Sequence, residues 1–492
     1  MKEVHFVDTT FRDGHASLWA EGMTTGMMLP VASAMDEIGF KSMEVIATSH
    51  FVKCVRELRE DPWQRIRLLS QRIRKTPLTL MMGHTIKTFE LTPFSVINLW
   101  MERIAVNGIK RVQLMDASND MSFRIPECVQ MARNAGLEVA MALIYSYSPR
   151  HTDDHYAQAT REAAKLKVDV IYLKDSGGLL TPERVKTLIP VILNNSHGIP
   201  VELHSHCTTG LAPLVYLEAV KLGIETIHTA IPPLANGSSQ PSVLNLVKNL
   251  RLMGFVPTVD EEAIKPISDH FRAIAKREGL PIGSPIEYDI YQYMHQVPGG
   301  VISNLKHQLS GLRMGHRLEE VLEEAVRVRK DLGYPIMVTP FSQFVVSQAA
   351  MNIMVGERYK QVSDEVIKYT LGLWGREAGS LVDANIKDRI LNLPRAKELL
   401  NWQPPQPSLG EIRETLGGAG VSDEDLLLRF LIPEEEIRAM RMAAGPVQEY
   451  FTARNPVVTL IHELLERKDL NYISIQKKDF SLTLRKDFRR CS

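Results

Sequence analysis

The sequence predicts an α/β fold: a (β/α)8 barrel with a C-terminal helical extension and a small α+β tail. Eight short β-like runs recur over about the first 240 residues, with helical stretches between them. Their spacing of roughly 25 to 40 residues is what a unit of strand, loop, helix and loop requires. No Gly-x-Gly-x-x-Gly pattern follows the first run, so a doubly wound open sheet with a phosphate-binding loop is disfavoured.

The eight predicted strands follow one another along the first half of the chain. In order they cover residues 4–8, 42–46, 78–82, 111–115, 138–144, 169–173, 201–204 and 225–229. In a barrel of this kind the strands are parallel, and their carboxyl ends lie on one rim, where the chemistry is found. Residues that follow distant strands therefore become neighbours.

Past about residue 255 the pattern changes to amphipathic helices, for example at 317–332. A proline-rich joint at 403–407 then interrupts the chain, an acidic helix start follows at 422–426, and an alternating run at 472–484 predicts a small hairpin. We therefore expect a barrel at 1–255, a helical extension that completes the active-site funnel at 256–402, and a C-terminal segment with a short tail at 403–492.

Composition narrows the class of protein. The 492 residues are 44% hydrophobic, enough for a large core and more than one domain. Basic and acidic residues number 58 each, so the net charge does not indicate nucleic acid or an anionic membrane as a partner. Four scattered cysteines without CxxC spacing favour a reducing compartment, and with neither a signal-peptide pattern nor a long apolar run we expect a cytoplasmic protein without a membrane span.

Polar residues gather at the predicted rim. His204 and His206 alternate along a strand and so share one face, which is a common way to offer a metal two neutral nitrogen ligands. A single histidine is more often structural, so this pair alone leaves metal binding open. Arg12 and Asp13 follow the first strand; the simpler interpretation of these two is a surface ion pair of little consequence.

Lys174 stands at the inner end of a predicted strand, just before Asp175. A buried lysine must be paired, deprotonated or modified. It could pair with Asp13 or Asp175, act as a Schiff-base amine, or capture carbon dioxide as a carbamate. A carbamate, one aspartate and two imidazoles would together balance the charge of a divalent cation.

Five ordered segments resemble the carboxyltransferase domain of biotin-dependent enzymes, a family that includes pyruvate carboxylase, the oxaloacetate decarboxylase alpha subunit and the transcarboxylase large subunit. The segments are 8–15, 173–182, 204–210, 239–242 and 298–305, within a match that runs from residue 4 to about 450. The resemblance implies a metal, usually zinc, manganese or cobalt, held by Asp13, carbamylated Lys174, His204 and His206. It also implies that Ser303 passes a proton between the ureido nitrogen of biotin and the acceptor carbon, and that Arg12 helps to stabilise an enolate.

Two departures from the family pattern concern the substrate. Ala16 stands where the family usually has glutamine, and Met82 where it usually has arginine before glycine. Losing a guanidinium fork and an amide should cost several kcal/mol of binding free energy for pyruvate or oxaloacetate. We therefore expect a different small carbonyl acceptor. His84 or Lys87 could substitute; alternatively, Met81 and Met82 are core residues and the anion site has moved.

The resemblance also implies partners. No lysine hairpin of a biotinylated carrier is evident, so the carboxylated carrier and a biotin carboxylase are expected on other polypeptides, docking on the extension or the tail, and the chain is expected to form a homodimer. Three alternatives stay open: an oxaloacetate-type decarboxylase subunit, a biotin-independent metal-dependent lyase or aldol-type enzyme on the same barrel, and a scaffold with a decayed site. Lys174 distinguishes the family from the lyases, which use no carbamylated lysine.

Overall fold

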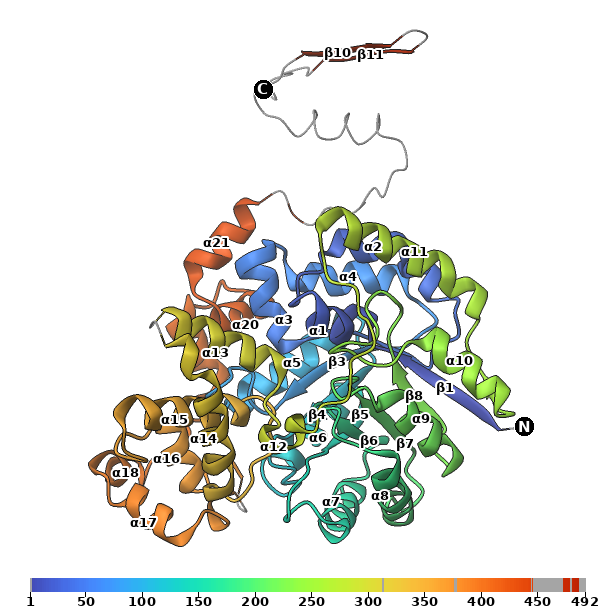
Figure 1. Ribbon diagram of the computed structural model, residues 1–492. Coiled ribbons are helices and arrows are strands. Elements are labelled where there is room, and N and C mark those ends of the chain that lie inside the picture. Colours follow the sequence, from blue (N-terminus) through green and yellow to red (C-terminus); the bar gives the residue numbers. More distant parts are fainter. Residues whose placement is uncertain are drawn as a thin grey trace. The chain divides into compact units, whose positions relative to one another are not determined.

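The computed structural model describes residues 2–311, 314–375, 378–443, 445, 472–477 and 480–485. Eight parallel strands close into a barrel in the order β2-β3-β4-β5-β6-β7-β8-β1, and β1 pairs with β2 to complete the circle (Figure 1). They are β1 Glu3–Asp8, β2 Ser42–Ala47, β3 Leu78–Gly83, β4 Arg111–Met115, β5 Glu138–Ile144, β6 Val170–Asp175, β7 Val201–Ser205 and β8 Thr226–Thr229. The predicted (β/α)8 barrel is confirmed, and each predicted run overlaps its strand.

A helix returns the chain after each strand and packs outside the barrel. These helices are α2 Thr25–Met35, α4 Pro62–Arg72, α5 Phe94–Val106, α6 Ile125–Asn134, α7 Asp153–Lys165, α8 Pro182–Asn195, α9 Ala212–Lys221 and α10 Val243–Leu252. Local sequence fixes several starts: Thr181 accepts a hydrogen bond from the backbone N–H of Arg184 at the start of α8, and Pro182 occupies the first helical position. Four short elements lie in the rim loops, η1 Thr10–Gly14, α1 His15–Leu18, α3 Thr48–Lys53 and η2 Cys54–Leu58, and β9 Val256–Pro257 pairs with β1.

The barrel interior is unusually polar. Barrels of this fold are normally filled by branched aliphatic side chains. Here buried polar residues stand at alternate positions of the strands: Ser42 and Glu44, Arg111 and Gln113, Tyr172 and Lys174, Glu202 and His204, and Thr226 and His228. Because alternate residues of a strand share a face, these side chains share the inner face of the barrel. Burying so many polar groups is costly unless they satisfy one another, which marks the interior as a built site.

Helices dominate the chain after the barrel. They are α11 Glu261–Glu278, α12 Tyr291–His295, α13 Gly299–Gly311, α14 Leu318–Asp331, α15 Phe341–Val355, α16 Asp364–Thr370, α17 Ala384–Leu391 and α18 Pro394–Leu399, with short turns η3 Gly315–Arg317 and η4 Ala378–Ser380. Val321, Phe344 and Tyr369 belong to a core formed largely by these helices. Arg329 ties the extension to the barrel mouth, since its Nη2 donates to Oγ of Ser146 at 3.0 Å.

The segment after the proline-rich joint returns to the barrel wall through α19 Leu409–Leu416, α20 Asp423–Leu431 and α21 Glu434–Met442. Ser95 Oγ donates to the carbonyl of Pro407 at 2.7 Å, and Arg67 Nη1 pairs with Glu424 at 2.9 Å. Ser422 begins α20 by accepting from the backbone N–H of Asp425, which confirms the predicted acidic helix start. The division of the chain at residues 255 and 402 stays a prediction.

The chain divides into two compact units, Met1–Gln448 and Glu449–Ser492. In the second, β10 Tyr472–Lys477 pairs antiparallel with β11 Phe480–Arg485, which confirms the predicted hairpin. Within the described ranges, no helix is long and apolar enough to cross a membrane. Cys54, Cys128 and Cys207 are free and buried, and Cys491 lies outside the described residues.

Candidate metal centre and reaction cavity

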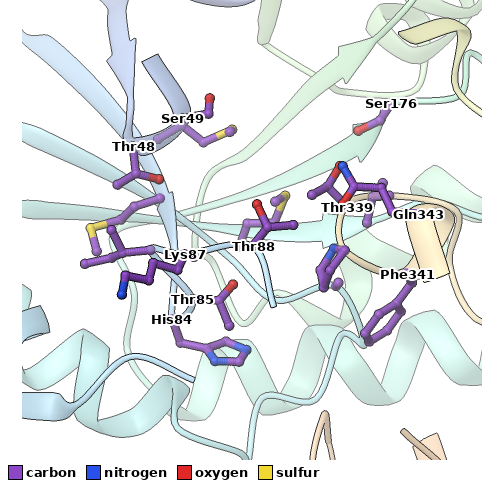
Figure 2. Close-up of a pocket in the computed structure, with 18 of the residues that line it drawn as sticks. Thr48, Ser49, His84, Thr85, Lys87, Thr88, Ser176, Thr339, Phe341 and Gln343 are labelled. Carbon is purple, nitrogen blue, oxygen red and sulfur yellow. The ribbon is translucent and has the colours of Figure 1, made fainter. Parts of the chain in front are cut away.

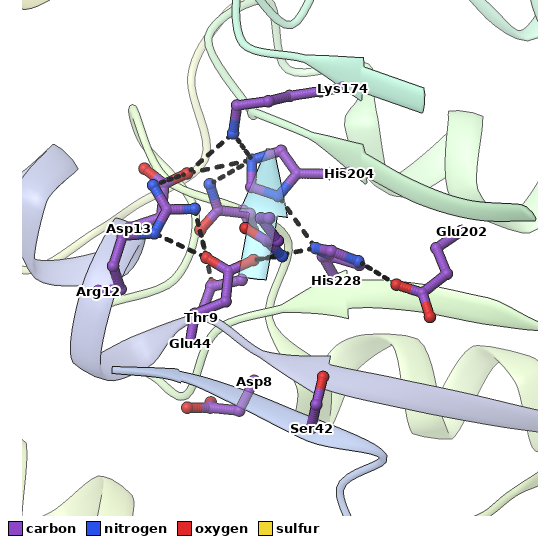
Figure 3. A network of polar contacts seen from close by, with 12 residues as sticks. Asp8, Thr9, Arg12, Asp13, Ser42, Glu44, Lys174, Glu202, His204 and His228 are labelled. Atoms are coloured by element: carbon purple, nitrogen blue, oxygen red, sulfur yellow. Dashed lines mark hydrogen bonds and ion pairs between the residues drawn. The ribbon is translucent and has the colours of Figure 1, made fainter. Parts of the chain in front are cut away.

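Four predicted site residues meet at the carboxyl rim of the barrel. Asp13 comes from η1, Lys174 from β6, and His204 and His206 from β7 and the residue after it. Oδ2 of Asp13 lies 3.1 Å from Nε2 of His204, 3.4 Å from Nε2 of His206 and 3.6 Å from Nζ of Lys174. The two Nε2 atoms are 3.2 Å apart. The structure therefore brings together the residues that the sequence predicts as one cluster, of which Figure 3 labels Asp13, Lys174 and His204.

The spacing of these atoms fits a divalent metal. Bonds of about 2.1 Å to one cation separate neighbouring ligand atoms by about 3.0 to 3.5 Å. The distances within the cluster fall close to that range. His206 also has the required tautomer, because its Nδ1 lies 2.7 Å from the carbonyl oxygen of Ser238, which can only accept, and so its Nε2 carries a lone pair.

Gln240, from the predicted 239–242 motif, supports the same assignment. Thr9 Oγ1 donates to Oε1 of Gln240 at 2.7 Å, which leaves the amide nitrogen 3.1 Å from Nε2 of His206. An amide N–H donates to an imidazole nitrogen only where that nitrogen carries no proton. The Nε2 atom of His206 is thus an acceptor, as a metal ligand must be.

Burial sets the protonation of the cluster. It lowers the pKa of Lys174, an effect that Asp13 offsets only in part, and it lowers the pKa of His204 well below its usual value, with Lys174 adding to the effect. Burial works against the charge on Asp13, yet Arg12, His206 and Lys174 outweigh it and hold the pKa of that carboxyl well below its usual range. Burial thus works against a charge on Lys174 and on His204, while the neighbouring positive groups keep Asp13 as a carboxylate.

Arg12 is not the surface residue of the simpler interpretation. It is 4% exposed, its Nη1 lies 3.0 Å from Asp13, and its Nε donates to Oε2 of Glu44 at 2.7 Å. Burial opposes its charge, but Asp13 and Glu44 hold the pKa of Arg12 above its usual value. The interpretation of Arg12 and Asp13 as a solvated ion pair is wrong, because closure of the barrel covers both.

Several buried residues of the site were not found from the sequence. Glu44, Gln113, Glu202 and His228 connect to the cluster of Asp13, Lys174, His204 and His206 through Arg12 and His204. Figure 3 shows Glu44, Glu202 and His228 beside Arg12 and His204. Gln113 Nε2 donates to Oε1 of Glu44 at 2.7 Å. A signal for them existed, since each interrupts an apolar strand with a polar side chain two residues from another polar position.

A cavity of about 750 Å³ opens beside the cluster. Arg12, Asp13, Lys174 and His206 line its inner part, and Met82 and His84 line it from the end of β3. Figure 2 shows Thr48 and Ser49 from the rim loops across the cavity from Thr339 and Phe341 of the extension. The extension thus supplies one wall of the cavity, at residues that include Val338, Gln343 and Trp374.

The predicted substrate-contacting positions are only partly brought together. Met82 and His84 line the cavity, but Ala16 does not, because it belongs to α1, beyond the turn that carries Asp13. Ser303 lies within α13, and its side chain lies outside the described residues.

Charged side chains that could hold a substrate carboxylate already have acidic partners. His84 Nε2 lies 2.8 Å from Asp116, Lys87 Nζ lies 3.4 Å from Glu90, and Arg56 pairs with Glu436 at 2.5 Å. The ends of β3 and β4 instead present Met81, Met82 and Met115 to the cavity. The lining is therefore poor in unpaired positive charge.

Two family models match the chain. One, described as HMGL-like, matches residues 3–270, and the other, described as a conserved carboxylase domain, matches residues 293–470. A pyruvate carboxylase subunit from Methanocaldococcus jannaschii is 35% identical, over 90% of this chain and 79% of that protein. The 2-oxoglutarate carboxylase large subunit of Hydrogenobacter thermophilus is 30% identical, over 88% of this chain and 67% of that protein.

The fold also matches a solved structure. The carboxyl transferase domain of Rhizobium etli pyruvate carboxylase superimposes with a TM-score of 0.80 and 24% sequence identity, covering 92% of this chain and 80% of that one. At that identity the match is evidence of the fold alone, and it confirms a barrel with a helical extension.

Proposed function

The chain belongs to the carboxyltransferase family of biotin-dependent enzymes, and on this premise we propose that it moves a carboxyl group between carboxybiotin, carried on a separate protein, and a small carbonyl-containing acceptor other than pyruvate. The observation that carries the proposal is the convergence of Asp13, Lys174, His204 and His206 at the inner end of a cavity. The match at 293–470 and the carboxylase relatives set aside the lyase alternative.

Asp13, His204 and His206 would hold a divalent metal, with Lys174 as the fourth ligand once carbamylated. These residues would thereby place a Lewis acid that would polarise the acceptor carbonyl and stabilise negative charge on an enolate oxygen. Arg12, which lines the same cavity, would add a fixed positive charge there. Asp13 and Glu44 keep Arg12 in place for this role.

Carbamylation of Lys174 is favoured by its surroundings. Only an unprotonated amine attacks carbon dioxide, and burial lowers the pKa of Lys174. Attack forms the N–C bond and releases a proton, and it converts a lysine that would repel a cation into an anionic ligand. The Nζ atom lies 3.3 Å from Nε2 of His204, so the carboxyl group added to it would stand beside the proposed ligands.

We assign to Ser303 the transfer of a proton between the acceptor carbon and the ureido nitrogen of biotin. Carboxybiotin that loses carbon dioxide leaves an anionic ureido nitrogen, while the acceptor carbon must lose a proton. A hydroxyl can pass this proton without becoming charged. The assignment rests on the family resemblance of residues 298–305, and Ser303 itself stands in α13 (Gly299–Gly311).

The acceptor is expected to lack the carboxylate of pyruvate. Met82 is 1% exposed at the end of β3 and lines the cavity, where a guanidinium would form two charge-assisted hydrogen bonds with a carboxylate. The two nearest candidates to replace it, His84 and Lys87, face Asp116 and Glu90. These features support an acceptor with an uncharged or bulkier group.

The carboxylated carrier and a biotin carboxylase are expected as partners, and the family further suggests a homodimer. Two relatives named as subunits of carboxylases support an assembly of separate chains. The cavity wall from the extension and the helices α19–α21 are candidate docking surfaces for the carrier.

The test is carboxyl transfer from free carboxybiotin to a panel of ketones and acyl compounds, with pyruvate and oxaloacetate as comparison substrates. The wild type should carboxylate at least one member of the panel faster than pyruvate. Lys174→Ala should abolish transfer, whereas Lys186→Ala, which changes an exposed lysine on α8, should not. Faster carboxylation of pyruvate than of every other compound would overturn the proposed acceptor. Transfer by Lys174→Ala at the wild-type rate would overturn the proposed metal centre.

A further inference from the structure

A second cavity, of about 360 Å³, adjoins the reaction cavity. Phe89, Trp374, Trp402 and Phe430 line it with four aromatic side chains, and prolines and leucines supply most of the remaining wall. The aromatic residues come from distant parts of the chain: the loop after β3, the segments after α16 and α18, and α20. We call this space the aromatic cavity. Its volume and its mainly apolar lining are typical of a site for a small organic molecule.

The aromatic cavity is separate from the reaction cavity but shares a wall with it. Trp374 lines both cavities, and Phe430 of the aromatic cavity is followed in the chain by Leu431 of the reaction cavity. Lys87 lines the reaction cavity, and its Nζ lies 4.6 Å from the centre of the Phe430 ring. None of the four residues of the proposed metal cluster lines the aromatic cavity, so the proposed function does not account for it.

The aromatic side chains are not closed off by packing. Phe89 is 38% exposed, and Trp402 and Phe430 are only partly buried, whereas Trp374 is buried. An apolar molecule in the cavity would remove these surfaces from water, which is favourable. A flat ring suits them, because aromatic rings pair in offset-stacked or edge-to-face contacts.

Lys368, on α16, gives the aromatic cavity a positive charge. Its Nζ lies 4.7 Å from the centre of the Trp402 ring, and within the described residues this ammonium has no hydrogen bond or ion pair. Asp364, one turn earlier on α16, is held instead by Arg395 through hydrogen bonds of 2.9 and 2.6 Å. Glu90 is the other charged residue of the lining, and Nζ of Lys87 lies 3.4 Å from its carboxylate and offsets that charge. An anionic group on a ligand would therefore complement Lys368.

We propose that the aromatic cavity is a second binding site, which takes a small aromatic carboxylate. The ring of the ligand lies among Phe89, Trp402 and Phe430, and its carboxylate pairs with Lys368. The inference goes beyond the proposed function and does not depend on it, because it uses neither the metal cluster nor the acceptor.

Isothermal titration calorimetry of the full chain with 2-naphthoate tests the site. Two comparison ligands each remove one feature: 2-naphthamide keeps the flat ring without the charge, and decahydro-2-naphthoate keeps the charge without the flat ring. We expect 2-naphthoate to bind at one saturable site per chain. The amide should bind about tenfold more weakly, and the saturated acid several-fold more weakly.

Three variants locate the probe. Lys368→Met keeps the apolar stem but removes the ammonium, so it should weaken 2-naphthoate about tenfold and abolish the preference for 2-naphthoate over the amide. Lys397→Met is the matched control, because it removes an exposed lysine of α18 outside the cavity, and it should leave the affinity unchanged. Leu373→Trp fills the cavity while keeping Lys368, and it should abolish binding.

Several outcomes would overturn the inference. Two of them need no variant to fold: a wild type that does not bind 2-naphthoate, and a wild type that binds the amide equally well. Unchanged affinity in a folded Leu373→Trp protein would place the probe elsewhere. Lys174→Ala should bind 2-naphthoate as the wild type does, and a loss there would place the probe in the reaction cavity. Because carboxyl transfer is measured separately, failure of this site and failure of the proposed function are distinguishable.

Discussion

At the scale of single residues, the proposed choice of acceptor depends on Met82. It is buried at the end of β3 with Met81 and Met115 near it in the lining. Introducing a guanidinium there supplies the two-pronged donor that a carboxylate needs. We expect Met82→Arg to lower the KM for pyruvate at least tenfold and to raise the KM for the natural acceptor. Steady-state carboxyl transfer measures both values.

Met82→Lys is the matched control for that variant, because it adds the same charge without the fork. Met82→Lys should lower the KM for pyruvate much less than Met82→Arg does. Equal KM values for pyruvate in the wild type and Met82→Arg would show that the anion site lies elsewhere and that Met82 is a packing residue.

Asp8 gives a residue-scale prediction for pH. Burial raises its pKa to about 7, although hydrogen bonds from Thr10 oppose the shift. A raised carboxyl pKa means that the folded state binds the proton more tightly than the unfolded chain, whose pKa is near 4. Below about pH 4 this group contributes its full share to the free energy of unfolding. As the pH rises from about 4 to about 7, that contribution of up to about 4 kcal/mol is lost.

Asp8→Asn cannot ionise and removes this dependence. Urea unfolding of both proteins between pH 5 and 8 isolates the effect, since all other groups titrate alike. The free energy of unfolding of the wild type should fall relative to that of the variant as the pH rises. A difference that stays constant over this range would contradict the raised pKa.

At the scale of the elements, the strands were predictable and their inner faces were not. Runs such as 111–115 and 138–144 match β4 and β5 at both ends, because strand length and spacing follow from local sequence. Glu44 and His228 were missed because a polar residue inside a strand points inward or outward according to register and barrel closure, which a single run does not reveal. Asp13, Lys174, His204 and His206 could be found since they end or follow strands.

Arg111 and Glu202 give a prediction that joins β4 to β7 across the barrel. Both are fully buried, and removing Arg111 takes the cation from Oε2 of Glu202, leaving Lys41, 3.3 Å from Oε1, as a weaker and partly exposed partner. We expect Arg111→Met to cost about 3 to 5 kcal/mol of unfolding free energy. Adding Glu202→Gln should recover part of that loss, because the double variant buries no unpaired charge, and a double-mutant cycle in urea measures the coupling. Strictly additive losses would show that Arg111 acts on some other group.

At the scale of the whole molecule, the reaction cavity is shared between two parts of the chain. The barrel supplies Asp13, Lys174 and His206, and the extension supplies Val338, Thr339 and Phe341. The sequence predicted helices in the extension but not which of its residues face the barrel, because that depends on how the helices pack across long sequence separations. Arg329 and Ser146, 183 positions apart, form one of these contacts.

The proposed metal centre should also report on the stability of the whole fold, since its ligands come from η1, β6 and β7. A ligand that binds only the folded state stabilises it by about 2.7 kcal/mol at a hundredfold excess over its dissociation constant. If Lys174 binds as a carbamate, this stabilisation requires carbon dioxide as well as the metal. We expect Zn²⁺, Mn²⁺ or Co²⁺ to raise the Tm of the chelator-treated protein in bicarbonate buffer, and to raise it markedly less in buffer freed of carbon dioxide. Lys174→Ala should show the same small shift in both buffers, while Lys186→Ala should behave as the wild type. A metal-induced rise in Tm that is equal with and without bicarbonate in the wild type would contradict a carbamylated Lys174, because the fourth ligand would then not depend on carbon dioxide.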